Sequence, residues 1–128
     1  MGFATDVSLD DLIRREEEIF LRRMPKTAEL WERAQRSMPG GVSSSWASSR
    51  PLPVWVSHGE GAYVWDADGT RYADMHGGYG VNVVGHANPA VVRAVQQRVA
   101  RGTHFAQPTE DSIYVAEALA QRFGLPMW

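Results

Sequence analysis

The sequence predicts an α/β chain in which a short antiparallel sheet lies between helices. Residues 54–73 alternate β-branched and aromatic residues with glycine-rich turns, a composition typical of a strand meander. On both sides of this stretch, apolar residues recur at spacings of three and four, as on one face of an amphipathic helix. We therefore expect a helical N-terminal arm, a three-stranded antiparallel meander and two further helices.

The meander is expected to contain three short strands, at residues 54–56, 62–65 and 70–73. The connection His-Gly-Glu-Gly at 58–61 offers two glycines that can adopt positive φ. The connection Asp-Ala-Asp-Gly at 66–69 is typical of a type I turn that ends in a left-handed glycine. Both connections are short, which favours antiparallel pairing of neighbouring strands.

The N-terminal arm is expected to form two helices. Ser8 is a typical N-cap and two acids follow it, which predicts a first helix over residues 9–23. Pro25 is expected to end this helix, and Thr27 to cap a second helix over about 28–37. The polar face of the first helix mixes arginine and glutamate, which indicates a solvated face with i,i+4 pairs; the alternative is an arm that packs on a partner subunit.

Two helices are expected after the meander. Pro89 is a typical first residue for a helix over 89–101. Thr109 is expected to begin a last helix that Gly124 ends. The apolar residues 127–128 are typical of the start of a buried strand, so we expect the chain to be the front portion of a longer fold.

Composition excludes several classes of protein. The net charge of −2 argues against a nucleic-acid partner, and the absence of cysteine excludes a disulfide framework and thiolate metal sites. No apolar run reaches the roughly 18 residues of a membrane span. The N-terminus lacks the basic start and apolar core of a signal peptide, so a cytoplasmic protein is expected.

The familiar catalytic motifs are absent. The four histidines show no metal-ligand spacing, which predicts no metal site, and His86 is expected to order the loop before residue 88. The serines lack a Gly-x-Ser-x-Gly elbow, and no Gly-Lys-Ser/Thr follows the glycines of a phosphate loop. The run Gly-Gly-Tyr-Gly at 77–80 is not a dinucleotide fingerprint; it is expected to bring the backbone close to another group.

Residues 40–53 form a polar, serine-rich stretch. Such a composition is typical of a linker. Trp46 in its middle favours a docked loop instead, because an indole ring is costly to leave exposed.

Four motifs together resemble the N-terminal part of the class III aminotransferases, which use pyridoxal phosphate (PLP) and have the type I PLP-dependent transferase fold. They are Pro-Gly-Gly-Val-Ser-Ser at 39–44, the pattern G-x-G-A-x-x-x-D-x-D-G-x-x-Y-x-D at 59–74, Gly-His-Ala-Asn-Pro at 85–89 and Pro-Thr-Glu at 108–110. Their order and spacing fit, and within the family they are most similar to the glutamate-1-semialdehyde aminomutases. The resemblance covers residues 28–128 and only the first part of the family's usual length.

The resemblance implies a division of the chain and a set of partners. It implies an N-terminal helical arm at 1–38, a substrate loop and β-meander of the small domain at 39–86, and the first helices of the large domain at 87–128. Small-molecule amino donors and acceptors, PLP and a homodimeric assembly are implied for the parent enzyme.

The resemblance also implies which residues face the substrate. Ser44 aligns with a serine that helps to hold the substrate in the aminomutases, and Tyr79 aligns with the family's loop aromatic. Trp46 lies in the same substrate loop, and Arg50 is the nearest arginine to the position of the aminomutases' carboxylate-binding arginine. That position is Ala47 here, so a transaminase acting on β-amino acids or ω-amines is an alternative.

PLP chemistry requires a lysine for the Schiff base, an acid facing the pyridine nitrogen and donors for the phosphate. In the family these groups lie beyond the part that this chain resembles. The chain has a single lysine, Lys26, at a position that matches no Schiff-base lysine of the family. We therefore assign no catalytic or cofactor-binding residue, and expect this chain alone to be inactive; a non-catalytic, partner-dependent fragment is the remaining alternative.

Overall fold

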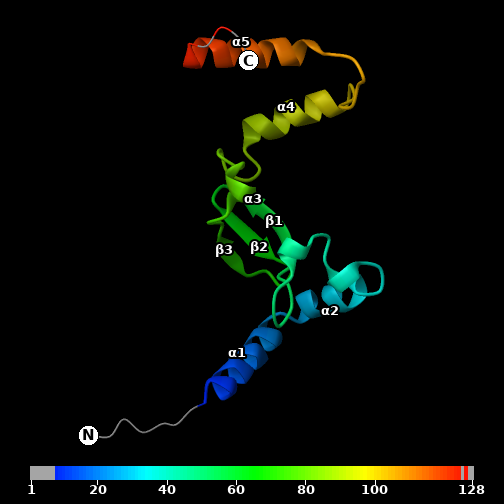
Figure 1. Cartoon of the computed structure of the whole chain (residues 1–128), viewed down its shortest axis with the longest axis vertical. Helices are drawn as coiled ribbons and strands as arrows, with labels where there is room; N and C mark the ends of the chain where they lie inside the picture. Colours follow the sequence, from blue (N-terminus) through cyan, green and yellow to red (C-terminus); the bar gives the residue numbers. More distant parts are fainter. Residues whose placement is uncertain (1–7, 125, 127–128) are drawn as a thin grey trace, which may run out of the picture. The chain divides into compact units, whose positions relative to one another are not determined.

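The structure, a computed structural model, describes residues 8–124 and Pro126. The strand predicted at residues 127–128 lies outside this part of the chain. The chain divides into two units, residues 1–88 and residues 89–128. The first unit carries the N-terminal helices and the sheet, and the second carries two helices (Figure 1).

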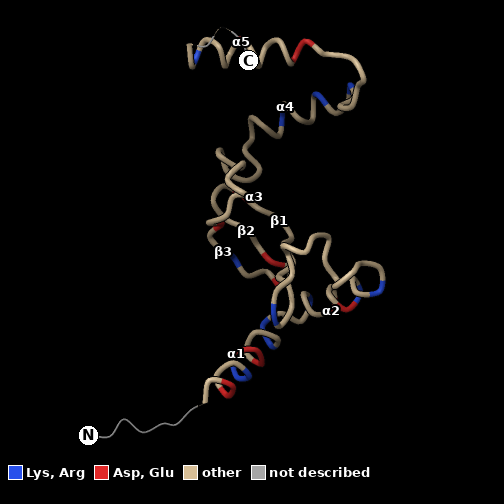
Figure 2. The backbone as a smooth tube through the Cα atoms, in the orientation of Figure 1, with Lys and Arg blue, Asp and Glu red and all other residues tan. Residues whose placement is uncertain are grey.

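Helix α1 (Leu9–Arg23) begins as predicted, at a capping serine. The hydroxyl oxygen of Ser8 accepts the backbone N–H of Asp11 at 3.1 Å. Acidic and basic residues alternate along the helix (Figure 2). Arg14 bridges Asp11 and Glu18, each at 3.2 Å, so the predicted local ion pairs form on an exposed face.

Helix α2 (Pro25–Ala34) begins earlier than predicted. Pro25 occupies its first turn instead of merely ending α1, because a missing N–H and a fixed φ suit the first helical position. The prediction that Thr27 caps the helix is wrong: Thr27 lies inside the first turn and is fully buried. Residues 35–38 continue only as turns, so the helix also ends earlier than predicted.

The sheet has three antiparallel strands in the order β1-β2-β3, as predicted. They are β1 (Val56–Glu60), β2 (Tyr63–Asp66) and β3 (Arg71–Ala73). Strand β1 lies later than expected, and Gly59 belongs to it rather than to a turn. A Cβ on Gly59 would lie 2.5 Å from Cγ of His86, so this glycine permits close approach of a side chain.

A buried carboxylate organises the turn between β2 and β3. Asp66 is 1% exposed, and its Oδ1 accepts the backbone N–H groups of Asp68 at 3.0 Å and Thr70 at 2.7 Å. Its Oδ2 accepts the hydroxyl of Tyr72 at 2.8 Å. Burial, together with this bond to Asp66, raises the pKa of Tyr72. The buried charge is therefore held by three donors, as a buried carboxylate requires.

Asp68, in the same turn, caps helix α2. Its carboxylate oxygens accept the backbone N–H of Lys26 at 2.7 Å and of Thr27 at 3.0 Å. Burial opposes ionisation of Asp68, but the hydrogen bonds from Thr27 and Lys26 outweigh it and lower the pKa of this carboxyl. The cap joins the sheet to the helical arm across some forty residues of sequence.

The buried apolar side chains of the described residues are few and lie in the first unit. They are Met24 at the α1–α2 junction, Ala34 at the end of α2, and Leu52 and Pro53 before the sheet. Among the described residues, no helix combines the length and apolar character needed to cross a membrane.

In the second unit, α4 (Pro89–Val99) starts at Pro89 as predicted, and α5 (Glu110–Phe123) ends at Gly124 in the left-handed conformation, also as predicted. Arg98 of α4 pairs with Asp111 of α5 at 3.0 Å. Both helices are amphipathic, but their apolar faces are exposed. The exposed residues include Val91, Val95 and Val99 on α4 and Ile113 on α5.

Removal of the Asp68 carboxylate should weaken the joint between sheet and arm. We expect Asp68→Ala to lower the free energy of unfolding by about 1 kcal/mol, the usual cost of losing a helix N-cap. Asp68→Asn keeps one accepting oxygen and should lose less. Urea unfolding followed by circular dichroism measures both, with Asp10→Ala, an exposed acid of α1, as the matched control. Equal losses in Asp68→Ala and Asp10→Ala would contradict the capping role.

Candidate functional site

Two loops that are distant in sequence meet in an aromatic cluster formed by Trp46, His76 and Tyr79. The ring centroids of Trp46 and Tyr79 lie 5.6 Å apart, and those of His76 and Tyr79 lie 4.5 Å apart in a T-shaped arrangement. Trp46 and His76 are 6.4 Å apart. Such distances are typical of favourable aromatic pairs. The cluster joins the short helical turn η2 (Ser45–Ala47) to the turn α3 (Gly77–Gly80).

The aromatic cluster is open to solvent. Trp46 is 70% exposed and Tyr79 is 67% exposed. The expectation that Trp46 is docked is therefore only half right, because its ring contacts Tyr79 but is not buried. Two large rings that contact each other and remain exposed form an apolar surface.

The first loop is shaped by glycine and serine. Gly41 has φ of 68°, and a Cβ there would lie 2.9 Å from the indole of Trp31, so the loop packs directly on α2. Ser44 accepts the backbone N–H of Trp46 at 3.4 Å and so begins η2. Ser44 thus lies beside Trp46, and its hydroxyl is engaged by the loop itself.

The second loop is a left-handed turn. All four residues of α3 have positive φ: 54° at Gly77, 58° at Gly78, 65° at Tyr79 and 77° at Gly80. Glycine adopts this conformation without steric penalty, whereas a tyrosine is strained by about 1–3 kcal/mol. The sequence predicted a close backbone approach here; the structure shows instead that the glycines serve the turn conformation. Strain at one aromatic residue on a loop is typical of a functional position.

Asp74 holds the beginning of this turn. Its Oδ1 accepts the backbone N–H groups of His76 and Gly77, both at 2.9 Å. Its Oδ2 accepts Nε2–H of His86 at 2.7 Å. The hydrogen bonds from Gly77, from the His86 ring and from His76 lower the pKa of Asp74 to about 2. The carboxylate is therefore ionised at neutral pH and has acceptor bonds on both oxygens.

His86 anchors this carboxylate to the sheet. Its backbone exchanges two hydrogen bonds with Gly61, at 2.8 Å and 2.9 Å, next to β1. With its amide assigned in the orientation that satisfies both ends, Asn82 places its oxygen 3.0 Å from Nδ1 of His86 and donates to the carbonyl of Gly85 at 2.9 Å. The prediction that His86 orders this loop is confirmed. Sequence reasoning missed Asp74 and Asn82 as its partners, although Asp74 ends the 59–74 motif.

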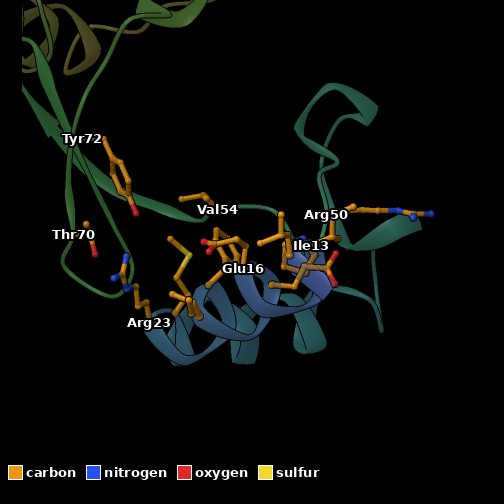
Figure 3. A pocket seen from close by; sticks show the side chains of 13 residues that line it. Ile13, Glu16, Arg23, Arg50, Val54, Thr70 and Tyr72 are labelled. Atoms are coloured by element: carbon orange, nitrogen blue, oxygen red, sulfur yellow. The ribbon is translucent and has the colours of Figure 1, made fainter. Parts of the chain in front are cut away.

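Arg50 lies in a different environment. It lines a hollow of about 730 Å³ between α1 and the sheet, together with apolar side chains of α1 and with Tyr72. In Figure 3 its guanidinium points away from the other labelled side chains of that hollow. The structure therefore brings Ser44, Trp46 and Tyr79 together, whereas Arg50 lines the hollow beside α1.

Lys26 lies in the first turn of α2, where Asp68 accepts its backbone N–H. Within residues 8–124 and Pro126, no group of three or more His, Asp or Glu side chains is arranged to hold a metal ion.

Comparison with known proteins identifies a family. The model of the family "Aminotransferase class-III" matches residues 44–125. A glutamate-1-semialdehyde 2,1-aminomutase of Bordetella avium is 45% identical over 102 residues, which are 77% of this chain and 24% of that protein. The residues that the family model matches include η2 and α3, the two turns of the aromatic cluster.

Two solved structures are similar in fold. An ω-transaminase from Sphaerobacter thermophilus aligns with a TM-score of 0.72 and 39% identity, over 80% of this chain and 24% of that one. A β-phenylalanine aminotransferase from Variovorax paradoxus aligns with a TM-score of 0.81 and 31% identity, over 91% of this chain and 27% of that one. The chain thus spans about a quarter of the length of these relatives.

Acid should weaken the hydrogen bonds that the Asp74 carboxylate accepts from His76, Gly77 and His86. Because its pKa in the folded chain, about 2, lies below the ordinary value of 3.8, its contribution to stability is present above about pH 4 and is lost as pH falls toward 2. We expect an NMR titration of the Asp74 carboxyl carbon to show a midpoint near pH 2, and His86→Ala to move that midpoint upward. A midpoint near 3.8 in the unmodified chain would contradict the hydrogen-bond geometry.

Proposed function

Because the chain belongs to the class-III aminotransferases, we propose that it forms the substrate-facing front part of a PLP-dependent enzyme that moves an amino group on an amino-acid-like substrate, in the manner of a glutamate-1-semialdehyde aminomutase. The observation that carries this proposal is the contact between Trp46 and Tyr79. Trp46 follows the 39–44 motif and Tyr79 precedes the 85–89 motif, and the family resemblance implies that both loops face the substrate.

In this proposal the chain's own residues bind and orient the substrate. The exposed rings of Trp46 and Tyr79 supply an apolar wall for the carbon skeleton. The hydroxyl of Ser44 accepts the backbone N–H of Trp46. Ser44 therefore contributes to the site by holding the turn that carries Trp46, as well as by its own hydroxyl. Ala47, on the same turn, offers no charge to a substrate carboxylate.

Bound PLP would accept the electrons of the reacting carbon. The side chains of this chain do not suit its covalent attachment. Lys26, the single lysine, lies beside Asp68 in the first turn of α2. Asp74, which precedes the turn α3, has both oxygens engaged by His76, Gly77 and His86. We therefore propose that the cofactor-binding lysine of the working enzyme is not in this chain.

Reductive trapping tests that proposal. We expect the purified chain, mixed with PLP and sodium borohydride, to give no stable pyridoxyl adduct at a single stoichiometric site, because Lys26 is not placed in a cofactor pocket. Mass spectrometry measures the adduct, with Lys26→Arg as the control for nonspecific labelling. A stoichiometric adduct that disappears in Lys26→Arg would show that this chain holds the cofactor.

A second candidate is a transaminase that acts on β-amino acids or ω-amines. The specific observation in its favour is Ala47, which stands where the resemblance places the aminomutases' carboxylate-binding arginine. The names of the two similar structures, an ω-transaminase and a β-phenylalanine aminotransferase, support the same alternative. The earlier prediction that Arg50 contacts the substrate stays a prediction.

A chimera separates the two candidates. This chain would replace the corresponding quarter of the aminomutase relative, and KM would be measured for its carboxylate-bearing semialdehyde and for β-phenylalanine. We expect Ala47→Arg to lower KM for the semialdehyde at least tenfold, because a charge-assisted hydrogen bond contributes about 1.5–3 kcal/mol.

Arg50→Ala is the matched control in the chimera, and we expect less than a twofold change in KM. The reverse result, with an inert Ala47→Arg and a tenfold loss in Arg50→Ala, would make Arg50 the carboxylate clamp. Absence of any amino transfer in a folded chimera would favour the alternative of a non-catalytic, partner-dependent fragment.

For the working enzyme we also propose a cytoplasmic homodimer, as the family resemblance implies. Sedimentation of the active chimera would measure the assembly, and a monomer with full activity would contradict it.

A further inference from the structure

We propose that Asp74 and His86 are positioning residues that fix the orientation of Tyr79 against Trp46. The inference rests on the proposed function in one respect, namely that the Tyr79 ring faces the substrate. Asp74 and His86 make no contact with a reacting group in this proposal. They act through the backbone of the turn α3.

The turn needs an external clamp because its conformation is costly. Its four consecutive residues are left-handed, and Tyr79 is the one member that carries a side chain. Inside the turn, the backbone N–H of Tyr79 donates to Nδ1 of His76 at 3.1 Å, and Gly80 donates to the carbonyl of His76 at 3.0 Å. Both bonds depend on where His76 lies.

Asp74 determines where His76 lies. Its Oδ1 accepts the N–H groups of His76 and Gly77, the two residues that open the turn. Its own backbone N–H donates to the carbonyl of Ala62 at 2.9 Å, so the carboxylate starts from the edge of the sheet. One side chain therefore connects the sheet to the start of the strained turn.

His86 fixes the direction of that carboxylate. Its Nε2–H donates to the second oxygen of Asp74 at 2.7 Å, while its backbone pairs with Gly61 in an isolated β-bridge. Gly59 leaves room for the ring, since any Cβ there would overlap it. The carboxylate of Asp74 is ionised and partly buried. The hydrogen bonds that it accepts are therefore charge-assisted and stronger than those between neutral groups.

These contacts form one path from the sheet to the aromatic cluster. The path runs from residues 61–62 to Asp74 and His86, then to His76, and then to Tyr79. The Tyr79 ring is thereby presented at 5.6 Å from Trp46. Loss of either member of the pair should release the ring while the sheet remains.

NMR of the full chain tests this path directly. The readouts are NOEs between the Trp46 and Tyr79 rings, the strong intraresidue amide-to-Hα NOE that marks positive φ at Tyr79, and cross-strand NOEs between Val64 and Tyr72. We expect Asp74→Ala and His86→Ala to reduce the ring NOEs at least threefold and to remove the positive-φ signature. The cross-strand NOEs should be unchanged, because the β2–β3 pairing does not use this pair.

Two further variants separate positioning from general stability. His86→Gln keeps an N–H donor near the position of Nε2 and should restore the ring NOEs. His58→Ala removes another imidazole of the same sheet, one that stacks on Trp65 at 4.8 Å, and should leave the ring NOEs unchanged.

The proposal is overturned if the ring NOEs persist in both Asp74→Ala and His86→Ala, or if His86→Gln behaves like His86→Ala. It is equally overturned if the cross-strand NOEs are lost together with the ring NOEs, because the pair would then support the sheet rather than the turn. These readouts need no substrate or cofactor. Failure of the chimera with the expected NOE pattern would therefore refute the proposed function alone.

Discussion

The capture of backbone N–H groups by carboxylates holds the first unit together. Asp66, buried in the β2–β3 turn, accepts two backbone N–H groups and the hydroxyl of Tyr72. Asp68, two residues later, accepts the first N–H groups of α2. Since few apolar side chains are buried in the described residues, these charge-assisted bonds carry much of the connection between helix, turn and sheet. The arm and the meander can then present their loops in a fixed relation.

The same chemistry explains why the 59–74 motif has its spacing. Gly59 makes room for His86, Gly61 pairs with the backbone of His86, and Asp74 binds the ring of His86. The acids at 66 and 68 close the turn and cap the helix. These five fixed positions of the motif therefore each have a structural role, in placing His86, closing the turn or capping α2. The fixed residues of the 59–74 motif thus support the backbone around the candidate site.

Much of this fold could be predicted from local patterns. The Ser8 cap, the three antiparallel strands, the start of α4 at Pro89 and the left-handed Gly124 all follow from interactions among near neighbours in sequence. The errors occurred where a distant group decided the outcome. Thr27 looked like a cap, but the actual cap comes from Asp68, which no local pattern indicates.

In the candidate site too, local motifs could be recognised from the sequence, whereas features that depend on distant groups could not. A resemblance to known motifs singled out Ser44, Trp46 and Tyr79, and the rings of the last two do meet. The left-handed path of 77–80 was missed, because a glycine-rich run is compatible with many conformations. Arg50 was singled out because it is the arginine nearest in sequence to Ala47, and its contact with the substrate stays a prediction. The role of Asp74 required the position of His86, which depends on pairing with a distant turn.

The left-handed turn has a consequence for how such a loop can diversify. A Cβ at positions 77, 78 or 80 would place an L-residue in a conformation that is costly for it, so these sites have little freedom to vary. Position 79 already bears that strain and points its side chain at the neighbouring indole. Within this turn, side-chain variety is thus confined to position 79, where exchange of one ring for another alters size and polarity without changing the backbone path. A single substitution at position 79 would therefore change the surface that this turn presents beside Trp46.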